Sequence, residues 1–132
     1  MGHSFSLRVY YEDTDMAGIV YYANYLKFIE RARSEWVRTL GLDQGRLRDE
    51  GLVFAVRRVV ADYLKPARFD DILTVDTQML AATSARSELR QEVRRDDDLL
   101  FTALVTLVCL GPDGRPARLP QALRLMLNSA PD

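Results

Sequence analysis

Apolar residues recur with two different periods along the first forty residues of the chain. Over residues 5–11, apolar and polar side chains alternate, which predicts a first strand. A loop containing Gly18 follows over residues 12–20. From Tyr25 to Leu40, apolar side chains recur every three or four residues, the spacing of an amphipathic helix of about five turns. Gly41 is a suitable stop for that helix.

The second half of the chain is rich in strands. Residues 43–51 predict a short helical turn, and residues 52–64, 72–80 and 84–95 predict three strands with breaks at 65–71 and 96–98. Residues 99–110 are apolar at nearly every position, so we predict a central strand that is covered on both faces. A turn over residues 111–116 and a short helix over residues 120–129 complete the chain.

The order of these elements predicts an α+β fold. Short reversals between strands favour antiparallel neighbours, and the broad apolar face of the helix must pack on one face of their sheet. The chain has 132 residues, of which 48% are hydrophobic and 28% charged, which is typical of one globular domain. We therefore predict a single domain over residues 1–132, with a curved antiparallel sheet of about five strands around one long central helix.

Composition narrows the possible functions. A net charge of -1 argues against a nucleic-acid binder that relies on bulk charge. No apolar run is long enough to span a membrane and the N-terminus has no signal-peptide pattern, so we expect a soluble, cytoplasmic protein. The only histidine is His3, near the chain end, and the only cysteine is Cys109, in an apolar run that suggests a buried thiol. With so few nitrogen and sulfur ligands, we expect no transition-metal site, and chemistry based on carboxylates, hydroxyls, backbone groups or water.

Three acids lie just before the predicted helix, at Glu12, Asp13 and Asp15. The N-terminus of a helix offers unpaired amides and about half a positive charge, which can stabilise an oxyanion. A nearby carboxylate can act as a general base or as a nucleophile. The alternative role of Asp15 is to cap a turn or the helix. We expect Asp13 to hold the loop by a hydrogen bond and Glu12 to be solvated.

Two segments resemble a known family. "VYYEDTDMAGIVYYANYLKFIERARSEW" and "YLKPARFDDIL" are similar to the hotdog-fold acyl-CoA thioesterases of the Tol–Pal-associated (YbgC-type) branch, which is related to 4-hydroxybenzoyl-CoA thioesterase. The resemblance covers roughly residues 5–125. It implies a hotdog fold, a homodimer that often pairs into a tetramer, and an active site at the dimer interface. It also implies hydrolysis of acyl-CoA thioesters without a metal or a cofactor, because the CoA is part of the substrate.

The resemblance also implies roles for individual residues. It assigns the catalytic aspartate to Asp15, the tight turn to Ala17 and Gly18, and the amide that polarises the thioester carbonyl to Tyr22. Many YbgC-type members carry histidine where this chain has Tyr22, so any contribution from that side chain is absent here, whereas the amide is retained. Tyr21 and Tyr22 are candidates to line the acyl pocket.

Basic residues near strand ends are candidates to bind the phosphates of CoA. They are Arg58, Lys65 and Arg68, followed by Arg57 and Arg86. Asp62 and Tyr63, at the end of a predicted strand, are further candidates for approaching the site of a second subunit.

Other functions remain open at this stage. The main alternative is a non-catalytic module that binds acyl-CoA or an acyl-carrier protein within a lipid or envelope complex. A hotdog dehydratase would need an internal histidine beside an acid, which the chain lacks. Only an enzyme would release a thiol in a manner that depends on Asp15. Short aliphatic, longer fatty and aromatic acyl groups are all compatible with the sequence.

Overall fold

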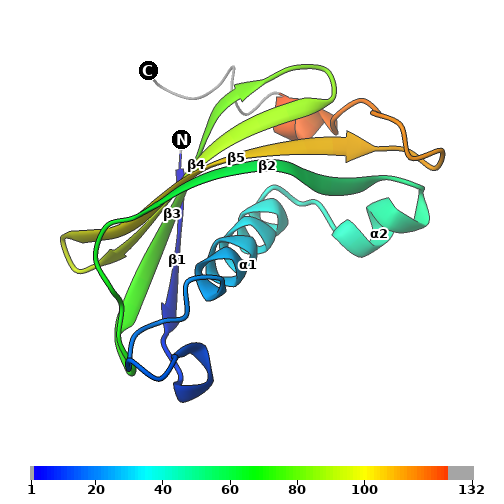
Figure 1. Ribbon diagram of the computed structural model, residues 1–132. Coiled ribbons are helices and arrows are strands. Elements are labelled where there is room, and N and C mark those ends of the chain that lie inside the picture. Colours follow the sequence, from blue (N-terminus) through cyan, green and yellow to red (C-terminus); the bar gives the residue numbers. More distant parts are fainter. Residues whose placement is uncertain (1, 125–132) are drawn as a thin grey trace.

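The computed structural model describes residues 2–124, which form one antiparallel sheet wrapped around a long helix (Figure 1). The elements in chain order are β1 (Gly2–Arg8), the 3₁₀ turn η1 (Tyr11–Asp13), α1 (Asn24–Thr39), α2 (Gln44–Asp49), β2 (Val53–Tyr63), β3 (Ile72–Ala82), β4 (Arg86–Arg95) and β5 (Asp98–Leu110). The five strands lie in the order β1-β3-β4-β5-β2. The predicted α+β fold with one central helix is confirmed.

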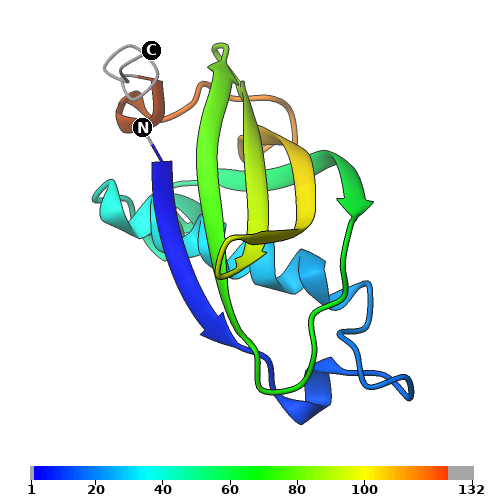
Figure 2. The same cartoon turned by 90° about the vertical axis from the view of Figure 1, so that its left-hand side faces the viewer.

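The path of the chain explains why α1 lies across the sheet. All neighbouring strands are antiparallel, and β3, β4 and β5 follow one another through tight reversals. β1 pairs with β3 at one edge, whereas β2 pairs with β5 at the other. The segment between β1 and β2 must therefore cross the concave face of the sheet, and α1 makes this crossing behind the strands in Figure 2.

The core forms where α1 meets this concave face. The helix buries an apolar stripe made of Tyr25, Phe28, Ile29, Ala32, Trp36 and Val37. Opposite it lie the inward-facing residues of the three inner strands, which include Leu73, Val75, Leu89, Val93, Phe101 and Val105. The spacing of three and four along the helix and the alternation along the strands thus place both apolar faces against each other.

The polar side chain of Gln91 connects elements inside this core. Gln91 on β4 is fully buried, and its Nε2 donates to the carbonyl oxygen of Ile29 at 2.9 Å and to Oγ1 of Thr77 at 2.9 Å. Its Oε1 accepts a hydrogen bond from Nη1 of Arg33 at 3.0 Å. Burial lowers the pKa of the Arg33 guanidinium. Gln91 therefore joins α1 to two strands and supplies the partner for a desolvated charge.

Two predicted strands differ from those in the structure. The sequence predicts the first strand over residues 5–11, whereas β1 begins at Gly2 and ends at Arg8. It ends early because the chain then turns into η1, where Tyr11 is 82% exposed. The prediction that β5 is covered on both faces is wrong. β5 does lie within the sheet, but α1 covers only its concave side, and Leu104 on the convex side is 48% exposed. The convex face of β5 therefore carries apolar side chains that α1 does not cover.

The C-terminal prediction can be compared only in part. Residues 121–124 form a short helical turn, as expected, and residues 125–129 of the predicted helix lie outside the described residues. Within residues 2–124, no helix is both long enough and apolar enough to cross a membrane.

Candidate active site

The loop between β1 and α1 is held by Asp13. This side chain is only 9% exposed, and its Oδ2 accepts a hydrogen bond from the backbone N–H of Tyr10 at 2.8 Å. Its carbonyl oxygen accepts from the N–H of Tyr21 and from Nδ2 of Asn24, both at 2.9 Å. The predicted structural role of Asp13 is confirmed, because these bonds tie the loop to the start of α1.

Asp15 lies on a tight turn that projects from this loop. Its N–H donates to the carbonyl oxygen of Ile19 at 2.9 Å, and its carbonyl oxygen accepts from the N–H of Gly18 at 3.0 Å. Gly18 has a positive φ, 78°, which a glycine adopts without strain. Oδ1 of Asp15 accepts from the N–H of Ala17 at 2.9 Å. The carboxylate is thus oriented by its own turn, is exposed to solvent, and does not cap α1.

The N-terminus of α1 is open. The residue at its N-cap position is Ala23, which has no side chain that could accept a hydrogen bond. Among the described residues, no acceptor is found for the backbone N–H of Tyr22 or of Ala23. The neighbouring amides are used, since Tyr21 donates to Asp13 and Asn24 donates to Tyr21. Free donors therefore remain at the positive end of the helix dipole, and one of them is the amide predicted at Tyr22.

An apolar pocket of about 310 Å³ lies beside this helix start. Its lining comes from the acidic loop, the first turn of α1 and the segment after β2: Ile19, Val20, Tyr22, Tyr25, Tyr63, Leu64, Lys65 and Pro66. The aromatic rings form a wall, with the centroid of Tyr63 6.2 Å from that of Tyr22 and 5.5 Å from that of Tyr25. Burial raises the pKa of both Tyr25 and Tyr63, so both phenols stay neutral near pH 7.

Most of the predicted substrate-binding residues gather around this pocket. Tyr22 and Lys65 line it, and Tyr21 packs against Tyr22 with ring centroids 4.9 Å apart. Arg68 forms an isolated β-bridge with Ile19, which places it next to the turn that carries Asp15. The Nζ of Lys65 lies 3.3 Å from a carboxylate oxygen of Asp98, a half-exposed ion pair that solvent screens.

Arg58 is not part of this group. It lies in the middle of β2 and borders a different hollow of about 360 Å³ on the convex side of the sheet, together with Val60, Leu80, Glu88 and Leu104. Tyr63, which the sequence offered as a candidate for a second subunit's site, lines the pocket of its own chain. The sequence signal was its position as the last residue of a strand before the Pro66 break.

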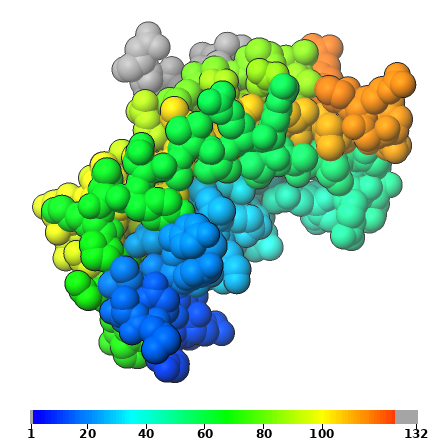
Figure 3. All heavy atoms as spheres, viewed as in Figure 1, coloured from blue at the N-terminus to red at the C-terminus, as the bar shows by residue number. Residues whose placement is uncertain are grey.

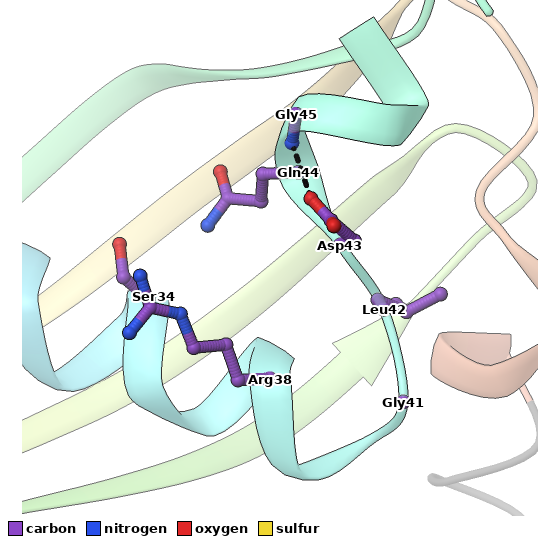
Figure 4. A pocket seen from close by; sticks show the side chains of 7 residues that line it. All are labelled: Ser34, Arg38, Gly41, Leu42, Asp43, Gln44 and Gly45. Carbon is purple, nitrogen blue, oxygen red and sulfur yellow. Dashed lines mark hydrogen bonds between the residues drawn. The ribbon is translucent and has the colours of Figure 1, made fainter.

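The larger hollow, about 510 Å³, lies at the opposite end of α1 (Figure 4). In it, Asp43 accepts a hydrogen bond from the N–H of Gly45 at 2.9 Å, and Arg38 pairs with Glu35 at 2.8 Å. The C-terminus of a helix carries negative partial charge, which has the wrong sign to stabilise an oxyanion. Figure 3 shows the two ends as separate lobes, the N-terminal loop in blue and α2 in teal, with the surface hollowed between them. We therefore place the candidate site at the N-terminal end.

Comparison with known proteins identifies the family. Residues 17–102 match the Thioesterase superfamily. "Acyl-CoA thioesterase YbgC" of Haemophilus influenzae is 43% identical over 110 residues, which are 83% of this chain and 81% of that protein. "Acyl-CoA thioester hydrolase YbgC" of Escherichia coli O6:H1 is 39% identical over 119 residues, or 89% of each chain.

A solved structure agrees with this assignment. The probable thioesterase from Bartonella henselae superimposes with a TM-score of 0.87 at 37% identity, over 91% of this chain and 100% of that one. The chain therefore belongs to the thioesterase superfamily and has the hotdog fold.

Proposed function

We propose that this protein hydrolyses acyl-CoA thioesters to the free acid and CoA. The observation that carries the proposal is the uncapped start of α1, where the amides of Tyr22 and Ala23 have no acceptor among the described residues. An exposed, loop-oriented carboxylate precedes this helix by one tight turn, and an apolar pocket of about 310 Å³ lies beside it. Membership of the thioesterase superfamily and the names of its YbgC relatives support the same reaction.

The chemistry follows from these parts. Attack on a thioester moves negative charge onto the carbonyl oxygen, and free N–H groups at a helix N-terminus can stabilise that charge. Donors of this kind typically contribute about 3 kcal/mol to lowering the barrier. The Tyr22 amide, assisted by that of Ala23, is the proposed donor, and Asp15 supplies the base or nucleophile. Gly18, with its positive φ, allows the tight turn that carries Asp15.

Two routes are open to Asp15. As a general base, it would take a proton from water, and the resulting hydroxide would attack the acyl carbon and expel the thiolate of CoA. As a nucleophile, a carboxylate oxygen would attack the acyl carbon, expel the thiolate and leave a mixed anhydride that water then cleaves. A single turnover in ¹⁸O-labelled water tests for the second route, because an unlabelled acid can arise only from the anhydride. The first route labels the released acid, whereas cleavage of the anhydride at the aspartyl carbonyl releases an unlabelled acid.

The substrate would lie across the pocket. The acyl group suits the apolar wall of Tyr22, Tyr25 and Tyr63, beside which Tyr21 packs. Lys65 at the pocket and Arg68 beside the turn are proposed to bind the phosphates of CoA, because ammonium and guanidinium groups pair with phosphate oxygens. Their replacement by alanine should raise KM for acyl-CoA more than it lowers kcat.

We propose that the protein works as a homo-oligomer. β2 is an edge strand of the sheet. It exposes several apolar side chains, which include Val53, Val56, Val59 and Val60. An apolar edge strand of this kind favours pairing with a second copy. The exposed Leu80 and Leu104 on the convex face offer a second contact, which would explain why β5 is apolar on both sides. Light scattering after size exclusion should give a dimer or a tetramer, and a monomer at micromolar concentration would contradict this proposal.

Thiol release by the wild-type protein tests the proposed activity. The substrates would be a short-chain, a long-chain and a hydroxybenzoyl CoA ester, each followed with a chromogenic thiol reagent. Turnover of at least one ester is the expected result, and the preferred ester would name the acyl class. Tight binding of CoA esters without thiol release would instead favour a module that recruits CoA esters or an acyl-carrier protein.

A further inference from the structure

The hydroxyl of Tyr63 joins the edge strand β2 to the start of α1. Its Oη donates a hydrogen bond to the carbonyl oxygen of Tyr22 at 2.9 Å. Among the described residues, no backbone N–H donates to this carbonyl, because Asn24 donates to Tyr21 and Leu26 donates to Ala23. The phenol therefore supplies the hydrogen bond that the interrupted backbone pattern leaves unmade.

This bond acts on the direction of a free amide. The carbonyl of Tyr22 and the N–H of Ala23 belong to one peptide group, which is planar and trans, so the two bonds point in opposite directions. Ala23 has helical dihedral angles, φ -70° and ψ -21°. In helical backbone, carbonyl oxygens point toward the C-terminal end and N–H groups toward the N-terminal end. Holding the Tyr22 oxygen against Tyr63 thus holds the Ala23 N–H out of the open end of α1.

The ring of Tyr63 is held separately from its hydroxyl. Its centroid lies 5.0 Å from that of Phe101, in an edge-to-face arrangement, and 5.5 Å from that of Tyr25. Removing only the hydroxyl should therefore leave the ring in place and release the peptide that follows Tyr22. Burial raises the pKa of Tyr63 above its ordinary value of 10.0, so the phenol remains a donor near neutral pH.

We propose that Tyr63 is a positioning residue for thioester hydrolysis, holding the peptide between Tyr22 and Ala23 so that its amide faces the reacting carbonyl. This inference rests on the proposed function and adds to it. Tyr63 would not touch the reacting atoms through its hydroxyl. It would act through the backbone at the start of α1, from a strand 41 residues away in sequence.

The test compares wild type with Tyr63→Phe and with the control Tyr11→Phe. Tyr11 is 82% exposed, and its hydroxyl makes no hydrogen bond within the described residues. For Tyr63→Phe we expect kcat to fall about tenfold with KM changed less than about twofold, the size of effect expected when one orienting hydrogen bond is lost. The melting temperature and the shape of the pH–rate profile should match those of wild type. Tyr11→Phe should leave kcat, KM and the melting temperature unchanged.

Several results would overturn this inference. An unchanged kcat in Tyr63→Phe would show that the hydrogen bond does not matter for catalysis. Loss of one limb of the pH–rate profile would make the phenol an acid or base, and a change confined to KM would make it a substrate contact. A wild-type protein without thiol release would refute the proposed function instead. If wild type is active and Asp15→Asn is not, while Tyr63→Phe behaves as wild type, only the role of Tyr63 fails.

Discussion

Replacing the buried amide Gln91 by methionine should destabilise the protein markedly. Methionine keeps nearly the same length and volume, so the core stays filled and the change removes polar atoms alone. The variant loses the hydrogen bonds to the carbonyl of Ile29, to Oγ1 of Thr77 and from the guanidinium of Arg33. The carbonyl of Ile29, the hydroxyl of Thr77 and the guanidinium of Arg33 then lack the hydrogen-bond partner that Gln91 provides.

The size of the effect follows from these three bonds. A neutral buried hydrogen bond contributes about 1 kcal/mol net, and one to a charged group about 1.5 kcal/mol or more. The greater hydrophobicity of methionine offsets part of this loss, by about 1 kcal/mol. We therefore expect the free energy of unfolding to fall by about 3 kcal/mol, which for a domain of this size lowers the melting temperature by roughly 10 °C.

Urea unfolding at one fixed protein concentration measures this change, because the stability of an oligomer depends on concentration. Gln78→Met is the matched control, since Gln78 is an exposed glutamine on the neighbouring strand, and it should stay within about 0.5 kcal/mol of wild type. The double variant Arg33→Met with Gln91→Met should be more stable than the sum of the single losses implies, by about 1 kcal/mol, because neither partner is then left unpaired. A Gln91→Met protein as stable as wild type would refute this reasoning.

Three further predictions concern the loop, the pocket and the thiol. Asp13→Ala should lower the free energy of unfolding by about 1 kcal/mol, because the N–H of Tyr10 loses its acceptor. Glu12→Ala, at the exposed neighbouring position, should leave this free energy unchanged. Thermal unfolding of the two variants measures the difference. Burial raises the pKa of Tyr25 above 10.0, so the unfolded chain loses the phenol proton at a lower pH than the folded protein does. The free energy of unfolding of the wild type should therefore fall as the pH rises from 10.0 upward. Tyr25→Phe should show a smaller fall over the same pH range. Burial also raises the pKa of Cys109, so this thiol should react with a chromogenic thiol reagent at least about a hundredfold more slowly in the native protein than in urea; equal rates would contradict its burial.

The central helix and the inner strands were predictable because their periods are regular. Apolar positions repeat along α1 at the spacing of a helix, and Leu73, Val75, Thr77 and Met79 alternate as a half-buried strand must. The outer face of β5 was not predictable from one chain. Leu104 is apolar and yet exposed, and a hydrophobic pattern alone does not tell which apolar side chains are buried within the chain.

The candidate site was only partly accessible to sequence reasoning. Asp15, Gly18 and Tyr22 lie in one short segment, so a local motif is enough to name them as candidates. Tyr63 meets Tyr22 only because the edge strand runs alongside the start of α1, and no local pattern encodes that contact. Gln91 was hidden for the same reason, since its partners lie on a helix and on a neighbouring strand.

The most direct test of the proposed mechanism is the kcat of Asp15→Asn for the preferred CoA ester. Asparagine can still accept the hydrogen bond from the N–H of Ala17, so the turn and the melting temperature should be preserved. We predict that kcat falls at least about a hundredfold, the loss expected when a general base or nucleophile is removed, while the exposed neighbour Glu12→Gln keeps wild-type activity. An Asp15→Asn protein that hydrolyses the ester at the wild-type rate would contradict the account and leave Asp15 as a residue that only shapes its turn.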